Sequence, residues 1–263
     1  MKNFYTYILL LSLILFTINV KAQLINENQL DTCKVFSSIS EAFKNPSTVY
    51  VLDLSASNIS EIPKGINQLS NLQKLNLANN NLTKLNSEIL KLKYLQELNL
   101  EENRIETLPI EIGNLINLKV LNLTRTKISS LPSSMSNLSN IKSLNLSWNN
   151  LKSDSILPIY KLKTLIDLNL KRNQIENISN EISELKNLKY LNLNFNPLSK
   201  LPEEICDLEN LIELDLGKNS ELKQLPNNLN KLKKLEYLNL ESVPISIEEK
   251  NKLLQLPDDI IEY

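Results

Sequence analysis

Leucine and isoleucine recur along most of the chain in one repeated pattern. Between Leu95 and Pro109 the order is L-x-x-L-x-L-x-x-N-x-I-x-x-L-P. Apolar residues two positions apart predict a short strand with one buried face, so Leu98 and Leu100 should point inward while the residues beside them face solvent. The pattern occurs nine times without a gap, every 23 or 24 residues, starting at Val49, Leu72, Leu95, Leu118, Ile141, Leu165, Leu188, Leu211 and Leu235.

This repeated unit resembles the leucine-rich repeat family, and within it the 23-residue type in which L-P-x-x-I-x-x-L follows the strand. Residues 108–115 and 201–208 match that segment at every fixed position. The resemblance implies an α/β solenoid, a curved horseshoe of about nine coils with a parallel sheet on the concave side. It also implies that the usual role is recognition of other proteins. The Asn-, Ile- and Lys-rich coils look like those of exported bacterial members.

Residues 1–22 have the pattern of an export signal. Lys2 precedes an apolar run from Ile8 to Ile18, and Val20-Lys21-Ala22 is suited to cleavage. The run of eleven residues is shorter than the roughly 20 that a membrane-spanning helix needs. We therefore expect a secreted or periplasmic protein without stable membrane insertion after cleavage. A retained membrane anchor is the alternative.

The two ends of the repeat array, residues 49–245, need covers for their exposed coils. In residues 23–48, the segment from Ser37 to Phe43 predicts a short helix that Pro46 stops. In residues 246–263, Ser246 and Glu249 have the spacing of a capping box ahead of a helix. We expect helical caps at both ends, and no catalytic or anchoring module after the second cap.

Composition argues against several classes of function. The formal net charge of −1 gives no electrostatic reason to expect a nucleic-acid partner. The chain contains no His, which excludes Ser-His-Asp and Cys-His nucleophiles as well as His-ligated zinc. With three Gly residues it has no phosphate-binding glycine loop. We expect a protein that is not an enzyme and that binds no cofactor or metal.

The two cysteines are too far apart to form a disulfide in this fold. Cys33 precedes the repeats and Cys206 lies in the seventh coil. Six strand spacings of about 4.8 Å separate them by roughly 29 Å, against roughly 4.4–6.8 Å between the Cα atoms of a disulfide. Both should be free, packed thiols.

An asparagine follows the strand in most coils, and a structural role explains it. An inward amide can satisfy backbone groups of its own and the adjacent coil where the chain leaves the sheet. Thr126 replaces it inside the array and puts the continuity of this ladder in doubt. In the fifth coil Asp154 stands where other coils have leucine, and Ser153 or Asp154 could cap a convex helix. The ladder residues are Asn80, Asn103, Asn149, Asn173, Asn196 and Asn219.

Outward residues of the strands fall into columns on the concave face. Repeat duplication can explain the central column without a ligand, and its amides could bond to one another along the sheet. We therefore expect Asn145→Ala to be nearly silent for stability. The central column is Asp53, Asn76, Asn99, Asn122, Asn145, Asn169, Asn192, Asp215 and Asn239.

Aromatic residues are scarce, at 5% of the chain, yet four of them fall at outward positions of coils five to nine. Rigid rings supply much of the binding energy in protein interfaces. The alternative is that Trp148 and Phe195 only shield the seams between coils. The candidate protein-binding residues are Arg125, Trp148, Arg172, Tyr190, Phe195 and Tyr237.

These patterns together indicate an exported module that binds a partner protein through its concave face. Two other functions stay open on the sequence alone. The same repeat type occurs in intracellular signalling scaffolds, which a cleaved export signal would exclude. A glycan-binding protein that uses the acidic and Asn columns is the second alternative.

Overall fold

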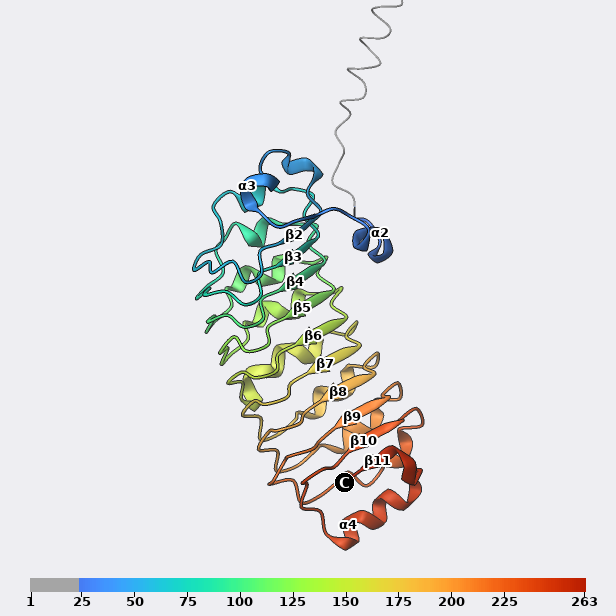
Figure 1. The fold of residues 1–263 in the computed structure, drawn as a ribbon. Helices are drawn as coiled ribbons and strands as arrows, with labels where there is room; N and C mark the ends of the chain where they lie inside the picture. The colour runs from blue at the N-terminus through green and yellow to red at the C-terminus, as the bar shows by residue number, and fades with distance from the viewer. Residues whose placement is uncertain (1–23) are drawn as a thin grey trace, which may run out of the picture.

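Eleven parallel strands form one sheet, in the order in which they occur along the chain. The structure is a computed structural model that describes residues 24–263. The predicted export signal, residues 1–22, lies outside the described residues. Successive coils stack beside one another and the sheet does not close, so the molecule is a curved solenoid (Figure 1). The predicted fold class is confirmed.

Each of the nine repeats, numbered as coils one to nine from Val49, contributes a three-residue strand. The central leucines of neighbouring strands pair, as Leu144 does with Leu121 and Leu168. This common register keeps inward and outward side chains in separate columns, because a shift by one residue would exchange them. The strands are β2 (Val51–Asp53), β3 (Lys74–Asn76), β4 (Glu97–Asn99), β5 (Val120–Asn122), β6 (Ser143–Asn145), β7 (Asp167–Asn169), β8 (Tyr190–Asn192), β9 (Glu213–Asp215) and β10 (Tyr237–Asn239).

The convex side of each of the first eight coils carries a 3₁₀ helix. In the L-P-x-x-I coils the proline stands just before the helix, where its fixed φ suits a helix start and its missing N–H leaves no donor unsatisfied. Within residues 24–263 no helix is long and apolar enough to cross a membrane. The convex helices are η2 (Ile66–Gln68), η3 (Ile89–Lys91), η4 (Ile110–Asn114), η5 (Ser133–Asn137), η6 (Ser153–Lys161), η7 (Asn180–Glu184), η8 (Glu203–Asp207) and η9 (Leu229–Lys231).

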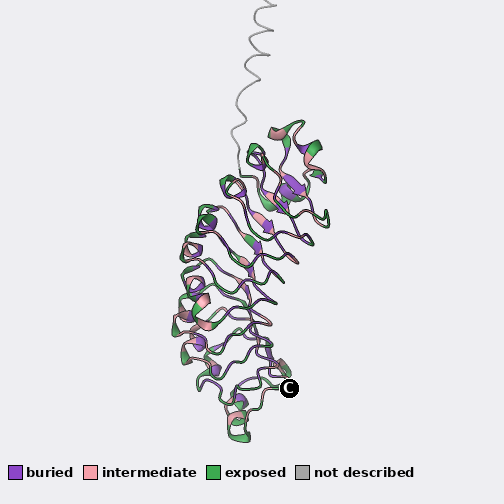
Figure 2. Cartoon of the chain, turned by 90° about the vertical axis from the view of Figure 1, so that its left-hand side faces the viewer, coloured by how far each residue is buried: buried purple, intermediate pink, exposed green. Residues whose placement is uncertain are grey.

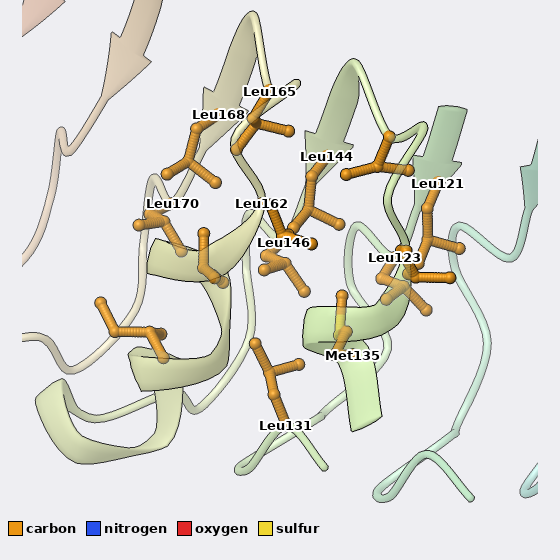
Figure 3. Packing of buried hydrophobic residues seen from close by; sticks show 14 of the residues in the cluster. Leu121, Leu123, Leu131, Met135, Leu144, Leu146, Leu162, Leu165, Leu168 and Leu170 are labelled. Atoms are coloured by element: carbon orange, nitrogen blue, oxygen red, sulfur yellow. The ribbon is translucent and has the colours of Figure 1, made fainter. Parts of the chain in front are cut away.

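The core is a row of aliphatic layers between the sheet and the convex helices. Figure 3 shows Leu144 and Leu146 packed between the corresponding leucines of the coils on either side, with Met135 of η5 beneath them. All three side chains are fully buried. Burial follows the inside of the solenoid from one end to the other (Figure 2). Burying a leucine contributes about 1.5–3 kcal/mol, so each layer stabilises both of its neighbours.

The inward asparagines form the predicted ladder, and one of its steps between coils is missing at Thr126. Asn149 Nδ2 donates to the carbonyls of Leu123 and Leu146, at 2.7 and 3.0 Å. Its Oδ1 accepts from the backbone N–H groups of Thr126 and Ile128. Thr126 Oγ1 lies 2.8 Å from the Leu123 carbonyl and 3.0 Å from Asn149 Oδ1, and its one proton can serve either. Among the described residues Thr126 makes no bond to coil three like the one by which Asn149 reaches the Leu123 carbonyl of coil four, so the ladder is interrupted at this one step.

Coil five has the longest convex helix, η6, with Pro158 inside it. Its first turn is held by Ser155, whose Oγ accepts from the Lys152 N–H at 2.8 Å. The expectation that Ser153 or Asp154 caps the helix is wrong. Ser153 Oγ instead accepts from the N–H groups of Glu176 and Asn177 in coil six, at 3.1 and 3.0 Å. Its hydroxyl links two coils because it lies at the contact between their convex turns.

The N-terminal cover contains more than the predicted helix. Helix α3 (Ile39–Ala42) lies within the expected segment, and η1 (Pro46–Thr48) follows it. In addition, α2 (Glu27–Asp31) lies beside the edge of the sheet, and β1 (Val35–Phe36) pairs with β2 (Figure 1). A paired strand satisfies the exposed backbone groups of the first coil, which a helix packed on the core cannot do.

The C-terminal cover also combines a helix with a strand. Ser246 caps α4 (Ile247–Asn251) by accepting from the Glu249 N–H at 3.3 Å, as the capping-box spacing predicts. Two 3₁₀ helices follow, η10 (Lys252–Gln255) and η11 (Asp258–Ile260), and β11 (Ile261–Glu262) then pairs with β10. The sequence did not predict β11, which covers the open edge of the last coil.

Cys33 and Cys206 are both free, as predicted. Cys206 is fully buried in coil seven, and burial raises the pKa of its thiol to about 11. The thiol form is therefore favoured, and the residue acts as part of the core. Cys33 is half-buried at the end of the α2 segment, where its Sγ donates to the Gln29 carbonyl.

Candidate interaction surface on the concave sheet

The central column of the concave face has a structural role that the sequence did not predict. In all nine coils the side-chain oxygen of this residue accepts the backbone N–H two residues further along, as Asn145 does from Ser147 at 3.0 Å. These bonds hold the chain where it leaves the strand. The bonds that run between coils within this column end on carboxylates, from Asn76 to Asp53 and from Asn192 to Asp215. The expectation of a ladder of amide-to-amide bonds is wrong.

The residue just before each inward ladder position has a left-handed backbone. We call these nine residues the outer column. Their φ values lie between 50 and 60°, where a residue with a Cβ is strained by about 1–2 kcal/mol. Asn79 alone among them is of a type that adopts this conformation readily. The outer column is Ala56, Asn79, Glu102, Arg125, Trp148, Arg172, Phe195, Lys218 and Ser242.

Five members of the outer column contact one another across coils three to seven. The Cζ of Arg125 lies 4.5 Å from the centre of the Trp148 ring, and the Cζ of Arg172 lies 3.9 Å from it on the next coil. Arg172 also lies 4.1 Å from the centre of the Phe195 ring. Arg125 Nη1 pairs with Glu102 Oε1 at 2.5 Å. We call this row of alternating cations and rings the stacked edge.

The stacking agrees with the interpretation that the rings shield the seams between coils, and their role in binding a partner stays a prediction. The rings lie over the neighbouring coils and so shield the seams between them. They also stay accessible, since Trp148 is 39% exposed and Phe195 is 37% exposed. A stacked, partly exposed ring is a suitable anchor for a partner, because little side-chain entropy is lost when it is covered.

Arg172 is the member of the stacked edge with unused hydrogen-bonding capacity. Its Nε is fully buried and has no acceptor, and Arg172 has no carboxylate partner within residues 24–263. In the same described range only three buried side-chain polar atoms lack a partner, and Asn194 Oδ1 in the adjacent coil is another. Buried polar groups in folded proteins are almost always bonded. Arg172 Nε and Asn194 Oδ1 are thus a donor and an acceptor in adjacent coils that each have room for a further bond.

Tyr190 and Tyr237 do not join the stacked edge. They occupy the first position of β8 and β10, and with Asp167, Glu213 and Asp215 they line a hollow of about 280 Å³ that we call the tyrosine hollow. Tyr237 Oη donates to Glu262 of β11, and this bond raises the pKa of Tyr237 to about 12. The six predicted site residues therefore form two groups, four on the stacked edge and two in this hollow.

Asp167 is the most perturbed carboxyl of the tyrosine hollow. Burial raises the pKa of Asp167, and a hydrogen bond from Ser143 Oγ at 3.0 Å opposes that shift in part. A charged group that loses water without gaining a cation is held at a cost to stability. Its position beside two exposed tyrosines makes it a candidate contact for a partner.

The sequence analysis missed a second hollow at the N-terminal half of the concave face. It has a volume of about 310 Å³ and contains the exposed side chains of Val35 and Val120 beside Lys74 and Glu97. Lys74 Nζ pairs with Glu97 Oε2 at 2.8 Å, and this bond raises the pKa of Lys74. Valine at an outward strand position, as at Val120, was the available signal. Val35 could not be placed because β1 was not predicted.

Comparisons with known proteins identify the class of this solenoid. Three family models match, described as leucine-rich repeat region over residues 86–196 and as leucine-rich repeat over residues 47–105 and 187–208. The chain belongs to the leucine-rich repeat family. Members of these families are in general protein-interaction modules rather than enzymes. A search of curated proteins found no match.

Solved structures with the same fold come from bacteria and plants. Internalin C2 of Listeria monocytogenes is 24% identical, with 83% of this chain and 82% of that one covered and a TM-score of 0.62. The plant peptide hormone receptor RGFR1, in complex with RGF2, is 23% identical, with 77% of this chain and 34% of that one covered and a TM-score of 0.64. A leucine-rich repeat protein of Leptospira interrogans is 24% identical, with 88% and 100% covered and a TM-score of 0.48. The likeness to internalin C2 and to the plant receptor shows the fold.

Proposed function

We propose that this protein is an exported module that binds another protein through the C-terminal half of its concave face. The stacked edge carries the proposal. Its side chains are long or aromatic although the backbone beneath them has a conformation that favours glycine or asparagine. Partly exposed rings that are held by neighbouring cations lose little side-chain entropy when a partner covers them. The tyrosine hollow on the same half adds two exposed rings to the contact area.

Binding energies of variants test which half of the concave face is used. Affinity purification with the chain from Gln23 onward, followed by mass spectrometry, supplies the partner, and calorimetry then compares variants. We expect Trp148→Ala or Tyr190→Ala to weaken binding by about 2 kcal/mol or more, because both rings lose contact area with the partner. The fold should be unchanged, since both side chains lie on the surface.

Two charged residues of the other half serve as matched controls. Lys74→Ala and Glu97→Ala alter the hollow that contains Val35 and Val120 without touching the stacked edge. Losses at Lys74 and Glu97 that equal or exceed those at the two rings would place the contact in the N-terminal half and overturn the proposal. A polysaccharide as the retained partner would overturn it in favour of glycan binding.

The proposal of export rests on residues 1–22 and has its own test. Expression of the full chain in a host that can be fractionated should give a secreted or periplasmic product, and its mass should correspond to a chain that begins at Gln23. An uncleaved chain that stays in the cytoplasm would support an intracellular scaffold instead. The two results concern location alone, and they leave the test of the stacked edge unaffected.

A further inference from the structure

The position of the Arg172 guanidinium is fixed by contacts on both of its faces. Trp148 lies over one face and Phe195 over the other, with the Arg172 Cζ 3.9 and 4.1 Å from the ring centres. The backbone beneath it is anchored as well, because the Arg172 N–H donates to the Asn194 carbonyl at 2.8 Å. An arginine held in this way has lost most of its rotamer freedom before any ligand arrives.

The unused donors of Arg172 lie in the plane of the guanidinium. Stacking occupies the two faces but makes no use of the N–H groups, which point outward from the edge of the plane. Arg125, the other arginine of the stacked edge, has its carboxylate partner in Glu102. Arg172 has none within the described residues, and its Nε is removed from water. A cation that is partly dehydrated and has free donors gains strongly from an anion in its plane.

The surroundings of Arg172 favour an anion and exclude an internal one. Lys171 is the preceding residue, and Arg125 lies on the far side of Trp148. Asp167, at the start of β7, accepts a hydrogen bond from Ser143 instead, and no carboxylate of the described residues pairs with Arg172. The stacked edge is therefore positively charged around Arg172, and no acid of the described concave face pairs with the Arg172 guanidinium.

The proposed class of partner decides among the anions that could bind. Guanidinium pairs with a carboxylate through two parallel hydrogen bonds, and a partner protein supplies carboxylates on its Asp and Glu side chains. A phosphate can pair with guanidinium in the same way, so sulfate is included in the test as a tetrahedral anion.

We propose that Arg172 is the anchor point for a carboxylate side chain of the partner protein. This inference rests on the proposed function and adds the chemistry of the partner: an acidic segment that lies across the stacked edge. Its Asp or Glu would lie beside Trp148 and Phe195 and would accept hydrogen bonds from the terminal N–H groups of the Arg172 guanidinium. The rings would contribute apolar contact on either side of the carboxylate.

The chain contains one Trp, so the fluorescence of Trp148 reports on this position alone. The probe is hexa-glutamate, titrated at constant ionic strength, with hexa-lysine and sulfate as the other arms. We expect a saturable change in Trp148 emission with hexa-glutamate and none with hexa-lysine. The absence of a change up to millimolar hexa-glutamate would overturn the proposal. A stronger response to sulfate than to hexa-glutamate would overturn the choice of a carboxylate.

Variants of Arg172 test whether the fluorescence response depends on the planar arrangement of the guanidinium N–H groups. Arg172→Lys keeps the charge but cannot form two parallel bonds, and Arg172→Gln removes the charge. Both should weaken hexa-glutamate binding about tenfold or more, as expected for a charge-assisted pair. Lys171→Gln, which removes one charge from the same coil, should change it less than about threefold. Equal losses in Lys171→Gln and Arg172→Lys would show attraction to general positive charge and would contradict the proposal.

The partner, once captured, separates this inference from the proposed function. If Trp148→Ala weakens partner binding and Arg172→Gln does not, the interaction surface stands and the carboxylate anchor is wrong. If neither variant weakens it, the proposed function fails as well. Circular dichroism of each variant checks that the fold is retained, which we expect because Arg172 lies at the surface edge of its coil.

Discussion

The backbone of the outer column is strained in the same way in every coil. A residue such as Trp148 costs about 1–2 kcal/mol more there than glycine does. None of the three glycines, Gly65, Gly113 and Gly217, stands in this column. Cation–π contacts of about 0.5–1 kcal/mol each offset part of the cost where the column forms the stacked edge. At Ala56 and Ser242 no such contact offsets it.

Asn145 shows how a residue on the surface can still be structural. Its Oδ1 accepts from the N–H and Oγ of Ser147, at 3.0 and 2.8 Å. We now predict that Asn145→Ala lowers the free energy of unfolding by about 0.5–1.5 kcal/mol, in place of the silent change expected from the sequence. Urea denaturation measures the loss. Asn114→Ala, at the exposed last residue of η4, is the control and should change stability by less than about 0.5 kcal/mol.

Asp167 should make stability depend on pH in the direction opposite to most carboxylates. Its pKa is raised in the folded state by burial, so the folded chain holds this proton more tightly than the unfolded chain. The contribution of Asp167 to the free energy of unfolding therefore falls as the pH rises above about 3.9, the pKa of this carboxyl in the unfolded chain. We predict that Asp167→Asn raises the free energy of unfolding at pH 7, and that the gain disappears below about pH 3.5. A gain that persists at acid pH would contradict this account.

At the scale of the element, each coil is one layer of the core. Leu144 is fully buried between two identical leucines. We predict that Leu144→Ala costs roughly 2–5 kcal/mol, because close-packed neighbours cannot collapse into the space left by the lost methyl groups. Chemical denaturation measures the change, and a loss below about 0.5 kcal/mol would show that Leu144 is not part of the core. Leu157→Ala, at an exposed leucine of η6, is the matched control.

The elements that the sequence predicted best are those with internal repetition. Nine strands could be placed because each is bounded by the same leucines and asparagine. The two capping strands could not, since β1 and β11 have two residues each and are too short to show alternation. They form because the end coils have unpaired backbone groups. That requirement belongs to the assembled sheet and leaves no pattern in the local sequence.

The sequence predicted which face of the molecule carries the candidate residues. It did not predict that they divide into the stacked edge and the tyrosine hollow. Strand alternation placed Tyr190 and Tyr237 outward, and the repeat register placed the other four candidates in a single column. The turn before Asn149, held by the bonds of its amide to the Leu146 and Ser147 carbonyls, makes the backbone of Trp148 left-handed and lays its ring along the edge. Tyr190 precedes such a turn by five residues and so lies in a different column. The spacing of each ring from its ladder asparagine distinguishes the two groups.

At the scale of the whole molecule, the N-terminal segment ties several coils together. Ile25 N–H donates to Gln73 of coil two, and Gln96 of coil three donates to the Ile25 carbonyl. Glu27 then pairs with Lys119 of coil four at 3.2 Å. In a solenoid most contacts join only neighbouring coils. This segment is a longer-range connection across coils two to four.

Because the backbone of the outer column is the same in every coil, the residues that could contact a partner occupy different positions of the repeat from the leucines that fold it. Eight residue types, from alanine to tryptophan, occupy the column with φ values that differ by 10° at most. Related chains could therefore exchange partners through single substitutions at this position, with no change to the leucines that fold the coil. A combinatorial library limited to these nine codons would explore new specificities on an unaltered scaffold.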